Sequence, residues 1–170
     1  VNDITGNAVN AALSDAGIGI GEIESAYFAN ATQGALEGQH MIPGQVALRS
    51  IGLQGVPVVN VENACASAST AFSLACKDIR SGDSSIALAV GAEKMITPDK
   101  AKNMAVFDGA IDVNGRDETL DGLMALSDGF ELPPEALEET GMRSVFMDVY
   151  AAIAKHHMKL HGTTQRQMAA

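Results

Sequence analysis

Short apolar runs of strand length alternate with helical patterns over the first 96 residues, and this alternation constrains the fold more than any other feature. The strand-like runs are residues 25–30, 56–61 and 86–90. Each is preceded by a helical pattern, at residues 4–16, 39–51 and 66–80. Strands joined through helices imply parallel pairing with right-handed crossovers. The sequence therefore predicts an α/β fold built on a parallel sheet.

Glycine and proline mark where several predicted elements begin or end. Gly17 and Gly82 close the first and third helices, since glycine readily adopts the left-handed conformation that ends a helix. Pro43 falls near the first turn of the second helix, where its missing N–H does least harm. Residues 86–90 form an unbroken apolar run, which predicts a strand buried on both faces. Residues 32–38 are predicted to form a glycine-spaced loop.

The character of the sequence changes after residue 96. Residues 107–139 hold ten of the 21 acidic residues and one arginine, and they predict a long irregular excursion. A helix is expected over residues 142–160 and ends before Gly162, and the segment from Thr163 has the pattern of a capped helix start. Because the chain opens on a helix with no strand before it and closes as another helix begins, we expect it to be a fragment.

Charge and cysteine usage exclude several classes of protein. Eleven Lys and Arg against 21 Asp and Glu give a net charge of −10, which argues against nucleic acid or an anionic membrane surface as the main partner. No apolar run is long enough to span a bilayer, and no secretion signal is visible. Two cysteines make neither a disulfide scaffold nor a zinc site. We expect a soluble, cytoplasmic protein with no membrane insertion, no nucleic-acid partner and no metal.

Cys65 is the residue with the most informative surroundings. A predicted strand ending at Val61 runs into a tight turn, and Cys65 follows at the first turn of a long helix of small residues. Unpaired backbone N–H groups and the positive end of the helix dipole favour thiolate over thiol there, and the same N–H groups can bind an oxyanion. The pattern indicates a nucleophile elbow, and the alternative is a small buried hydrophobic residue. Cys76, in the middle of the helix, is expected to pack in the core.

Three segments together resemble the thiolase family, and most closely its acetyltransferases of the sterol-carrier-protein type. They are the strand, turn and cysteine of residues 58–69, the strand of residues 86–95 that ends in Gly-Ala-Glu-Lys-Met, and Gly141-Met142-Arg143. The resemblance implies a thiolase-like layered α/β/α fold. Residues 1–96 would be part of its N-terminal domain and residues 97–170 part of its loop domain, with the C-terminal thiolase domain absent.

The same resemblance implies an activity and the residues that carry it. Cys65 would attack an acyl-CoA thioester to give an S-acyl-cysteine, and a second acyl-CoA would then be acylated to a 3-ketoacyl-CoA, or the steps would run in reverse. Met142 would line the acyl pocket, CoA thioesters would be the substrates, no cofactor would be needed, and the protein would form a homodimer or homotetramer. Thiolases also use a histidine and a second cysteine, in motifs that these 170 residues lack, so the chain by itself is expected to be inactive.

Other functions remain open at this point. Ketoacyl synthases carry a motif similar to the Ala-Cys-Ala-Ser around Cys65, and a non-catalytic or aldolase-type thiolase-like subunit would share the fold. His156, His157 and His161 cluster near a predicted helix end, and the last two stand four residues apart, a spacing that can bind zinc. No third ligand completes such a site, so a solvated helix end is expected. His40 is expected on a loop or helix surface.

Overall fold

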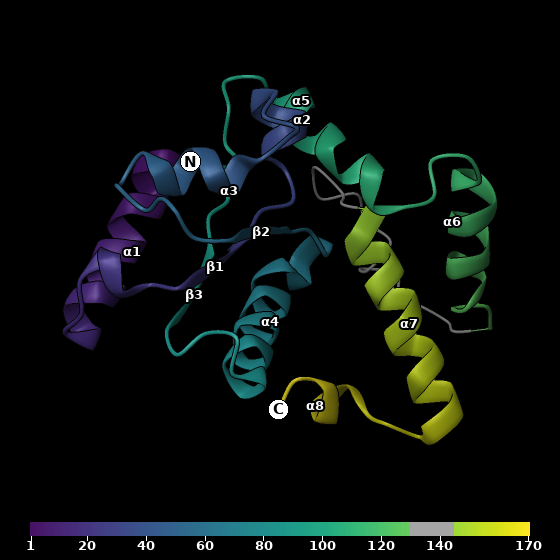
Figure 1. Ribbon diagram of the computed structural model, residues 1–170. Coiled ribbons are helices and arrows are strands. Elements are labelled where there is room, and N and C mark those ends of the chain that lie inside the picture. Colours follow the sequence, from purple (N-terminus) through teal and green to yellow (C-terminus); the bar gives the residue numbers. More distant parts are fainter. Residues whose placement is uncertain (130–144) are drawn as a thin grey trace. The chain divides into compact units, whose positions relative to one another are not determined.

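The computed structural model describes residues 1–129 and 145–170, and the chain divides into two compact units, Val1–Ala110 and Ile111–Ala170 (Figure 1). The two domains predicted from the sequence, with their boundary at residue 96, stay a prediction. Among the described residues, no helix combines the length and the apolar character that crossing a bilayer requires.

A three-stranded parallel sheet forms the centre of the first unit. Its strands are β1 (Ser25–Ala29), β2 (Val58–Val61) and β3 (Ala87–Gly91), in the spatial order β2-β1-β3. Both outer strands pair parallel to β1, and Phe28 of β1 lies opposite Asn60 of β2. The chain therefore leaves β1 for β2 on one side and then crosses over to β3 on the other. The predicted α/β fold with a parallel sheet is confirmed.

Helices cover both faces of this sheet (Figure 1). On one face, α1 (Asn2–Ala16) and α3 (Pro43–Arg49) contact each other and the strands, and on the other α4 (Ser67–Ser81) contacts all three strands. Because alternate residues of a strand point to opposite faces, Phe28 belongs to the core under α1 and α3, whereas Ala29 belongs to a smaller core under α4. This is the layered arrangement that the sequence predicted.

β1 is the most deeply buried strand because it has a strand on each side. Four of its five residues are buried. The sequence predicted that the apolar run at residues 86–90 would be buried on both faces, and this was wrong. Ala87, Leu88 and Ala89 are half-buried and Val90 alone in β3 is buried, since β3 is an outer strand of the sheet that the structure describes.

Glycines end the long helices as predicted, but one helix was missed. Gly17 and Gly82 follow α1 and α4 in the left-handed conformation, with φ of 68° and 83°. The predicted loop at residues 32–38 contains a short helix instead, α2 (Gln33–Glu37). A side chain that precedes the helix stabilises its first turn, because Oδ1 of Asn30 accepts a hydrogen bond from the backbone N–H of Gln33 at 2.9 Å. Five residues are too few for helical periodicity to reveal such an element.

Short helical pieces make up the rest of the first unit. They are η1 (Ile20–Glu22), η2 (Ala64–Ala66), α5 (Lys100–Ala105) and η3 (Val106–Ala110). The Nζ of Lys102 in α5 donates to the carbonyl of Leu36 at 2.7 Å, which fastens α5 to the end of α2.

The second unit contains α6 (Arg116–Ala125), which packs against α7 (Val145–His161), and the short α8 (Gln165–Met168). The prediction of an irregular excursion was wrong where η3 and α6 lie, because the glycines there flank or interrupt helices without preventing them. The capped helix start is confirmed, since Oγ1 of Thr164 accepts from the N–H of Gln167 at 3.3 Å within a capping box.

Candidate active site

Cys65 lies at the carboxyl edge of the sheet, on an exposed turn between β2 and α4. The sequence placed it in the first turn of the long helix. The structure instead places it in the 3₁₀ turn η2, two residues before α4 begins at Ser67. The side chain is therefore presented ahead of the helix N-terminus and is open to solvent, so the alternative of a buried hydrophobic residue was wrong.

The backbone immediately before Cys65 is strained. Ala64 has φ of 44°, in the left-handed region that residues other than glycine seldom adopt. Such a conformation costs an L-amino acid about 1–2 kcal/mol. Strain of this kind persists only where the surrounding structure enforces it, and it is concentrated at functional sites. The turn between β2 and α4 is therefore a strained strand-to-helix elbow, and the role of Cys65 as its nucleophile stays a prediction.

Side chains from both flanks hold this turn in place. Oε1 of Glu62 accepts from the N–H of Ala64 at 2.7 Å. Oγ of the buried Ser67 accepts from the N–H of Asn63 at 2.8 Å and donates to the carbonyl of Ala64 at 2.8 Å. These three bonds satisfy the N–H of Asn63 and both backbone groups of Ala64, so the turn that presents Cys65 is held by the protein's own side chains.

Small residues let α4 approach the sheet closely beside the elbow. A Cβ atom on Gly91, the last residue of β3, would lie 3.1 Å from Cβ of Ala68 and 3.6 Å from Cβ of Ala29. The small residues at the start of α4 therefore allow this helix to pack closely against the sheet.

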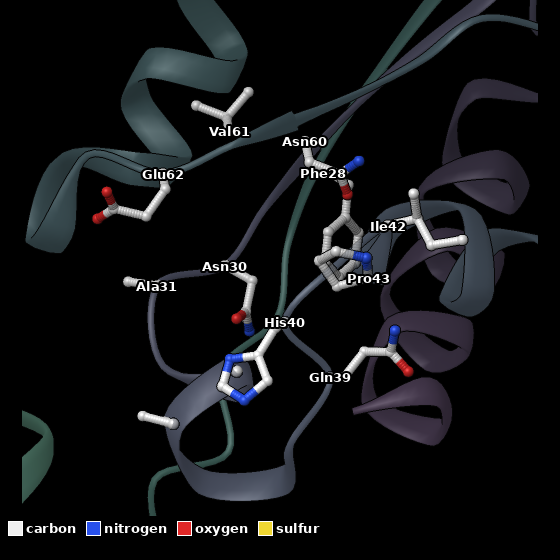
Figure 2. A pocket seen from close by; sticks show the side chains of 12 residues that line it. Phe28, Asn30, Ala31, Gln39, His40, Ile42, Pro43, Asn60, Val61 and Glu62 are labelled. Carbon is white, nitrogen blue, oxygen red and sulfur yellow. The ribbon is translucent and has the colours of Figure 1, made fainter.

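A pocket of about 350 Å³ opens at the carboxyl ends of β1 and β2, on the same edge as Cys65 (Figure 2). Figure 2 shows Asn30 and His40 on one side of it and Phe28, Ile42 and Pro43 on the other. In open α/β sheets, ligands bind outside the carboxyl ends of the strands. The pocket therefore lies where a ligand of this fold is expected.

Glu62 joins the pocket to the elbow. It lines the pocket, and its carboxylate also receives the N–H of Ala64. A second strained residue, Ile42, lies on the opposite wall with φ of 48°, although its β-branched side chain disfavours that region strongly. Both non-glycine residues with positive φ in the described part of the chain thus flank the pocket or Cys65.

Two polar residues of the pocket wall are held by other parts of the chain. Oδ1 of Asn60 accepts from the N–H of Gly44 at 2.7 Å, and its Nδ2 donates to Gln45 at 2.7 Å. Nδ2 of Asn30 donates to the carbonyl of Ala92 at 2.6 Å and to Glu93 at 2.7 Å. The side-chain amides of Asn30 and Asn60 therefore stabilise the pocket wall.

The other residues singled out from the sequence belong to other elements of the chain or fall outside the described residues. Cys76 is half-buried in α4, and both cysteines are free. Met142 falls in residues 130–144, outside the described residues, so its assignment to the acyl pocket stays a prediction. The rings of His157 and His161 lie 4.6 Å apart at the end of α7, and the described residues contain no group of three or more side chains able to hold a metal ion.

The pocket wall was not predicted from the sequence. His40 was expected at the surface and is exposed, but it also lines the pocket, and Asn30, Glu62 and Glu93 were not assigned a role. The one available signal was position, since Asn30, Glu62 and the turn containing Glu93 each follow a strand of the parallel sheet, and the carboxyl ends of parallel strands share an edge.

Comparison with known proteins identifies the family. The family model described as thiolase, N-terminal domain, matches residues 1–165. The non-specific lipid-transfer protein-like 2 of Caenorhabditis elegans is 31% identical over 169 residues, covering 98% of this chain and 36% of that protein. Sterol carrier protein 2 of Bos taurus is 29% identical over 167 residues, covering 98% and 27%. An acetyl-CoA acetyltransferase of Methanocaldococcus jannaschii is 28% identical over 158 residues, covering 93% and 34%.

The chain spans about a third of the length of these curated relatives. Within that span, the family model covers nearly all of the sequence, and the described sheet with helices on both faces has the layered α/β arrangement that the resemblance implied. On this evidence the chain belongs to the thiolase family, and it matches the family's N-terminal domain.

Proposed function

We propose that this chain carries the nucleophile of an acyl-CoA acyltransferase of the thiolase type, and that Cys65 is that nucleophile. The observation that carries the proposal is the strained turn at Ala64, which presents an exposed cysteine ahead of α4 at the carboxyl edge of the sheet. Similarity to proteins named acetyl-CoA acetyltransferase supports acyl-CoA as the substrate class.

In the proposed reaction, the Cys65 sulfur attacks the carbonyl carbon of an acyl-CoA thioester. The C–S bond to CoA breaks, CoA leaves as a thiol with the proton that Cys65 gives up, and an S-acyl-cysteine remains. A second acyl-CoA then loses a proton from its α-carbon. That carbon attacks the acyl group, and 3-ketoacyl-CoA and the Cys65 thiol are released. Read in reverse, the same steps cleave a 3-ketoacyl-CoA.

The backbone supplies the electrostatic part of this chemistry. The N–H of Cys65 is proposed as one donor to the oxyanion that forms when the thioester is attacked. The N-terminus of α4 begins two residues later and directs the positive end of its dipole toward this turn. Proton transfer requires further groups, and the family resemblance implies a histidine and a second cysteine in motifs that residues 1–170 lack.

The remaining parts of the proposal rest on the family resemblance. CoA thioesters serve as substrates, no cofactor is required, Met142 contributes to the acyl pocket, and the protein works as a homodimer or homotetramer. Acyl transfer by the whole protein is part of this proposal.

Intact-mass measurement with acetyl-CoA tests the nucleophile. The complete polypeptide should gain about 42 Da, the mass of one acetyl group replacing one proton. Cys65→Ala should abolish the adduct, whereas Cys76→Ala, which removes the half-buried second thiol, should retain it. An adduct that survives in Cys65→Ala, or a wild-type protein that stays unmodified, would contradict the proposal.

The acyl donor separates the proposed function from its alternatives. Acylation from acetyl-CoA followed by 3-ketoacyl-CoA formation supports the thiolase activity. A protein that accepts acyl groups only from a carrier protein would be a ketoacyl synthase. A folded protein that accepts neither donor would be a non-catalytic or aldolase-type subunit.

A further inference from the structure

The turn after β3 contains a carboxylate with an unusual number of partners. Oε1 of Glu93 accepts from Nδ2 of Asn30 at 2.7 Å, from the N–H of Thr32 at 3.1 Å and from Oγ1 of Thr32 at 2.7 Å. Oε2 accepts from the N–H of Ala31 at 2.9 Å. All four donors belong to the loop after β1, which precedes Glu93 by 61 to 63 residues.

The groups that donate hydrogen bonds to Glu93 take no part in the hydrogen-bond ladder of the sheet. Ala31 and Thr32 follow the end of β1, so their consecutive N–H groups point away from any strand ladder toward the carboxylate. Both polar atoms of the Asn30 side chain are hydrogen-bonded. Nδ2 donates to Glu93 and to the carbonyl of Ala92, and Oδ1 accepts from the first turn of α2. Glu93 therefore fixes the loop of residues 30–33, which leads directly into α2.

This loop forms one wall of the pocket. Asn30, Ala31 and Gly34 line it, and α2 stands against His40 so closely that a Cβ on Gly34 would lie 3.0 Å from Nδ1 of His40. A shift of the loop would move this wall and the imidazole with it. The opposite wall and the elbow around Cys65 have their own supports, Asn60 and Glu62, and do not depend on Glu93.

We propose that Glu93 is a positioning residue of the acyl-transfer site, holding the loop of residues 30–33 as the wall of the pocket that receives the acyl-CoA. This inference rests on the proposed function. It assigns Glu93 an effect on how substrate is bound, through Asn30, Ala31 and Thr32, and no part in the chemistry at the Cys65 sulfur. A carboxylate suits this position because it offers acceptors alone to four donors, and charge-assisted bonds of this kind are stronger than neutral ones.

Glu93→Gln is the informative change, because the new amide group would bring its own N–H donors against the N–H groups of Ala31 or Thr32. The matched control is Glu24→Gln. Oε2 of Glu24 accepts from the N–H of Ser85 at 2.6 Å, so this exposed glutamate also bonds a backbone amide across the sheet, but at the opposite edge, before β1. Glu24→Gln therefore controls for the loss of charge on an exposed glutamate that accepts from a backbone amide.

The kinetic test uses the complete polypeptide and acetyl-CoA. Glu93→Gln should raise KM for acetyl-CoA roughly tenfold, while the rate of Cys65 alkylation by iodoacetamide stays within about twofold of wild type. Glu24→Gln should leave both values unchanged. An unchanged KM in Glu93→Gln, or alkylation that slows in parallel with acyl transfer, would overturn the inference.

Hydrogen exchange separates this inference from the proposed function. In Glu93→Gln, the amides of Ala31 and Thr32 should exchange faster than in wild type, while those of β2 keep their protection. A wild-type protein that forms no acyl adduct refutes the proposed function, whatever these amides do. A wild-type protein that forms the adduct, together with unchanged exchange at Ala31 and Thr32 in the variant, refutes the role of Glu93 alone.

Discussion

The two edges of the same three-stranded sheet are built in different ways. At the amino edge, the buried Ser25 at the start of β1 donates to the carboxylate of Asp78 in α4, and Ser84 donates to Ser25 at 3.0 Å. At the carboxyl edge, the turn at Ala64 and the loop at Ile42 both have positive φ. Each edge is cross-linked by side chains, yet the described backbone is strained in this way only at the edge that carries Cys65.

This difference between the edges indicates that they serve different purposes. The hydroxyl and carboxylate groups at the amino edge satisfy one another without strain, which is what a scaffold requires. At the carboxyl edge, Glu62 and Ser67 hold an unfavourable backbone conformation in place. Strain that is maintained at a cost, next to a pocket and an exposed cysteine, is expected where geometry serves chemistry.

The largest effect is expected from Gly44→Ala, which tests how tightly the carboxyl edge is packed. A Cβ on this residue of α3 would lie 2.5 Å from Cβ of Phe28 and 2.8 Å from Oδ1 of Asn60. Phe28 is fully buried and has no room to move aside. We expect the free energy of unfolding to fall by about 2–3 kcal/mol, measured by urea denaturation.

Gly122→Ala is the control for this change. Gly122 lies inside α6, and a Cβ there would meet no atom within 4 Å. Alanine should therefore stabilise α6 by up to about 1 kcal/mol, through its higher helix propensity. If Gly44→Ala were equally harmless, α3 would not be packed against Phe28 and Asn60, which line the pocket.

Substitutions of Ala64 should sharpen the contrast between the edges, because glycine, which usually destabilises a protein, should not do so at this position. Glycine relieves the left-handed strain, so Ala64→Gly should be neutral or stabilise by up to about 1 kcal/mol, whereas Ala64→Val should destabilise by about 1–2 kcal/mol. Urea denaturation gives both values. Ala87→Gly, at the amino end of β3, should instead destabilise by about 0.5–1 kcal/mol, as glycine normally does in a strand.

An Ala64→Gly variant that loses as much stability as Ala87→Gly would remove the evidence for strain at the elbow. The rate of acylation at Cys65 provides a second reading. Ala64→Val should slow it, because a β-branched side chain disfavours the positive φ that presents the sulfur.

The sequence predicted features whose signals are local. The alternation of strands and helices, the terminating glycines Gly17 and Gly82, and the capping segment at Thr164 depend on residues within a few positions of one another, and the structure bears them out. The turn at Cys65 was predicted from the same kind of signal. Its exact place ahead of α4 was missed, because the residues around Cys65 are all small and do not mark where the 3₁₀ turn ends and the helix begins.

Features that depend on distant contacts could not be predicted. Glu93 meets Asn30 across 63 residues of sequence, and the close approach of Gly44 to Phe28 exists only after α3 has packed on β1. Alanine at position 64 gives no sign of positive φ, since the strain is imposed by Glu62 and Ser67. The nucleophile could therefore be proposed from the sequence, whereas the pocket beside it could not.

The smallest expected effect concerns the amino edge and its response to acid. Hydrogen bonds from Ser25 first, and then from Ser84, hold the pKa of Asp78 below its ordinary value of 3.8. Because the folded-state pKa lies below the unfolded one, the ionised carboxylate contributes stability at pH values above 3.8, and this contribution is lost as the pH falls through the lowered value. Wild type should therefore lose stability more steeply than Asp78→Asn below about pH 4.

Urea denaturation at several pH values between neutrality and about pH 2.5 measures this difference. The stability gap between wild type and Asp78→Asn should narrow as the pH falls below 3.8, and Ser84→Ala, which removes one of the hydroxyl donors, should give an intermediate slope. A gap that stays constant across this range would mean that Asp78 is not stabilised as a carboxylate by Ser25 and Ser84. The amino edge would then lack the paired network that distinguishes it from the strained edge at Cys65.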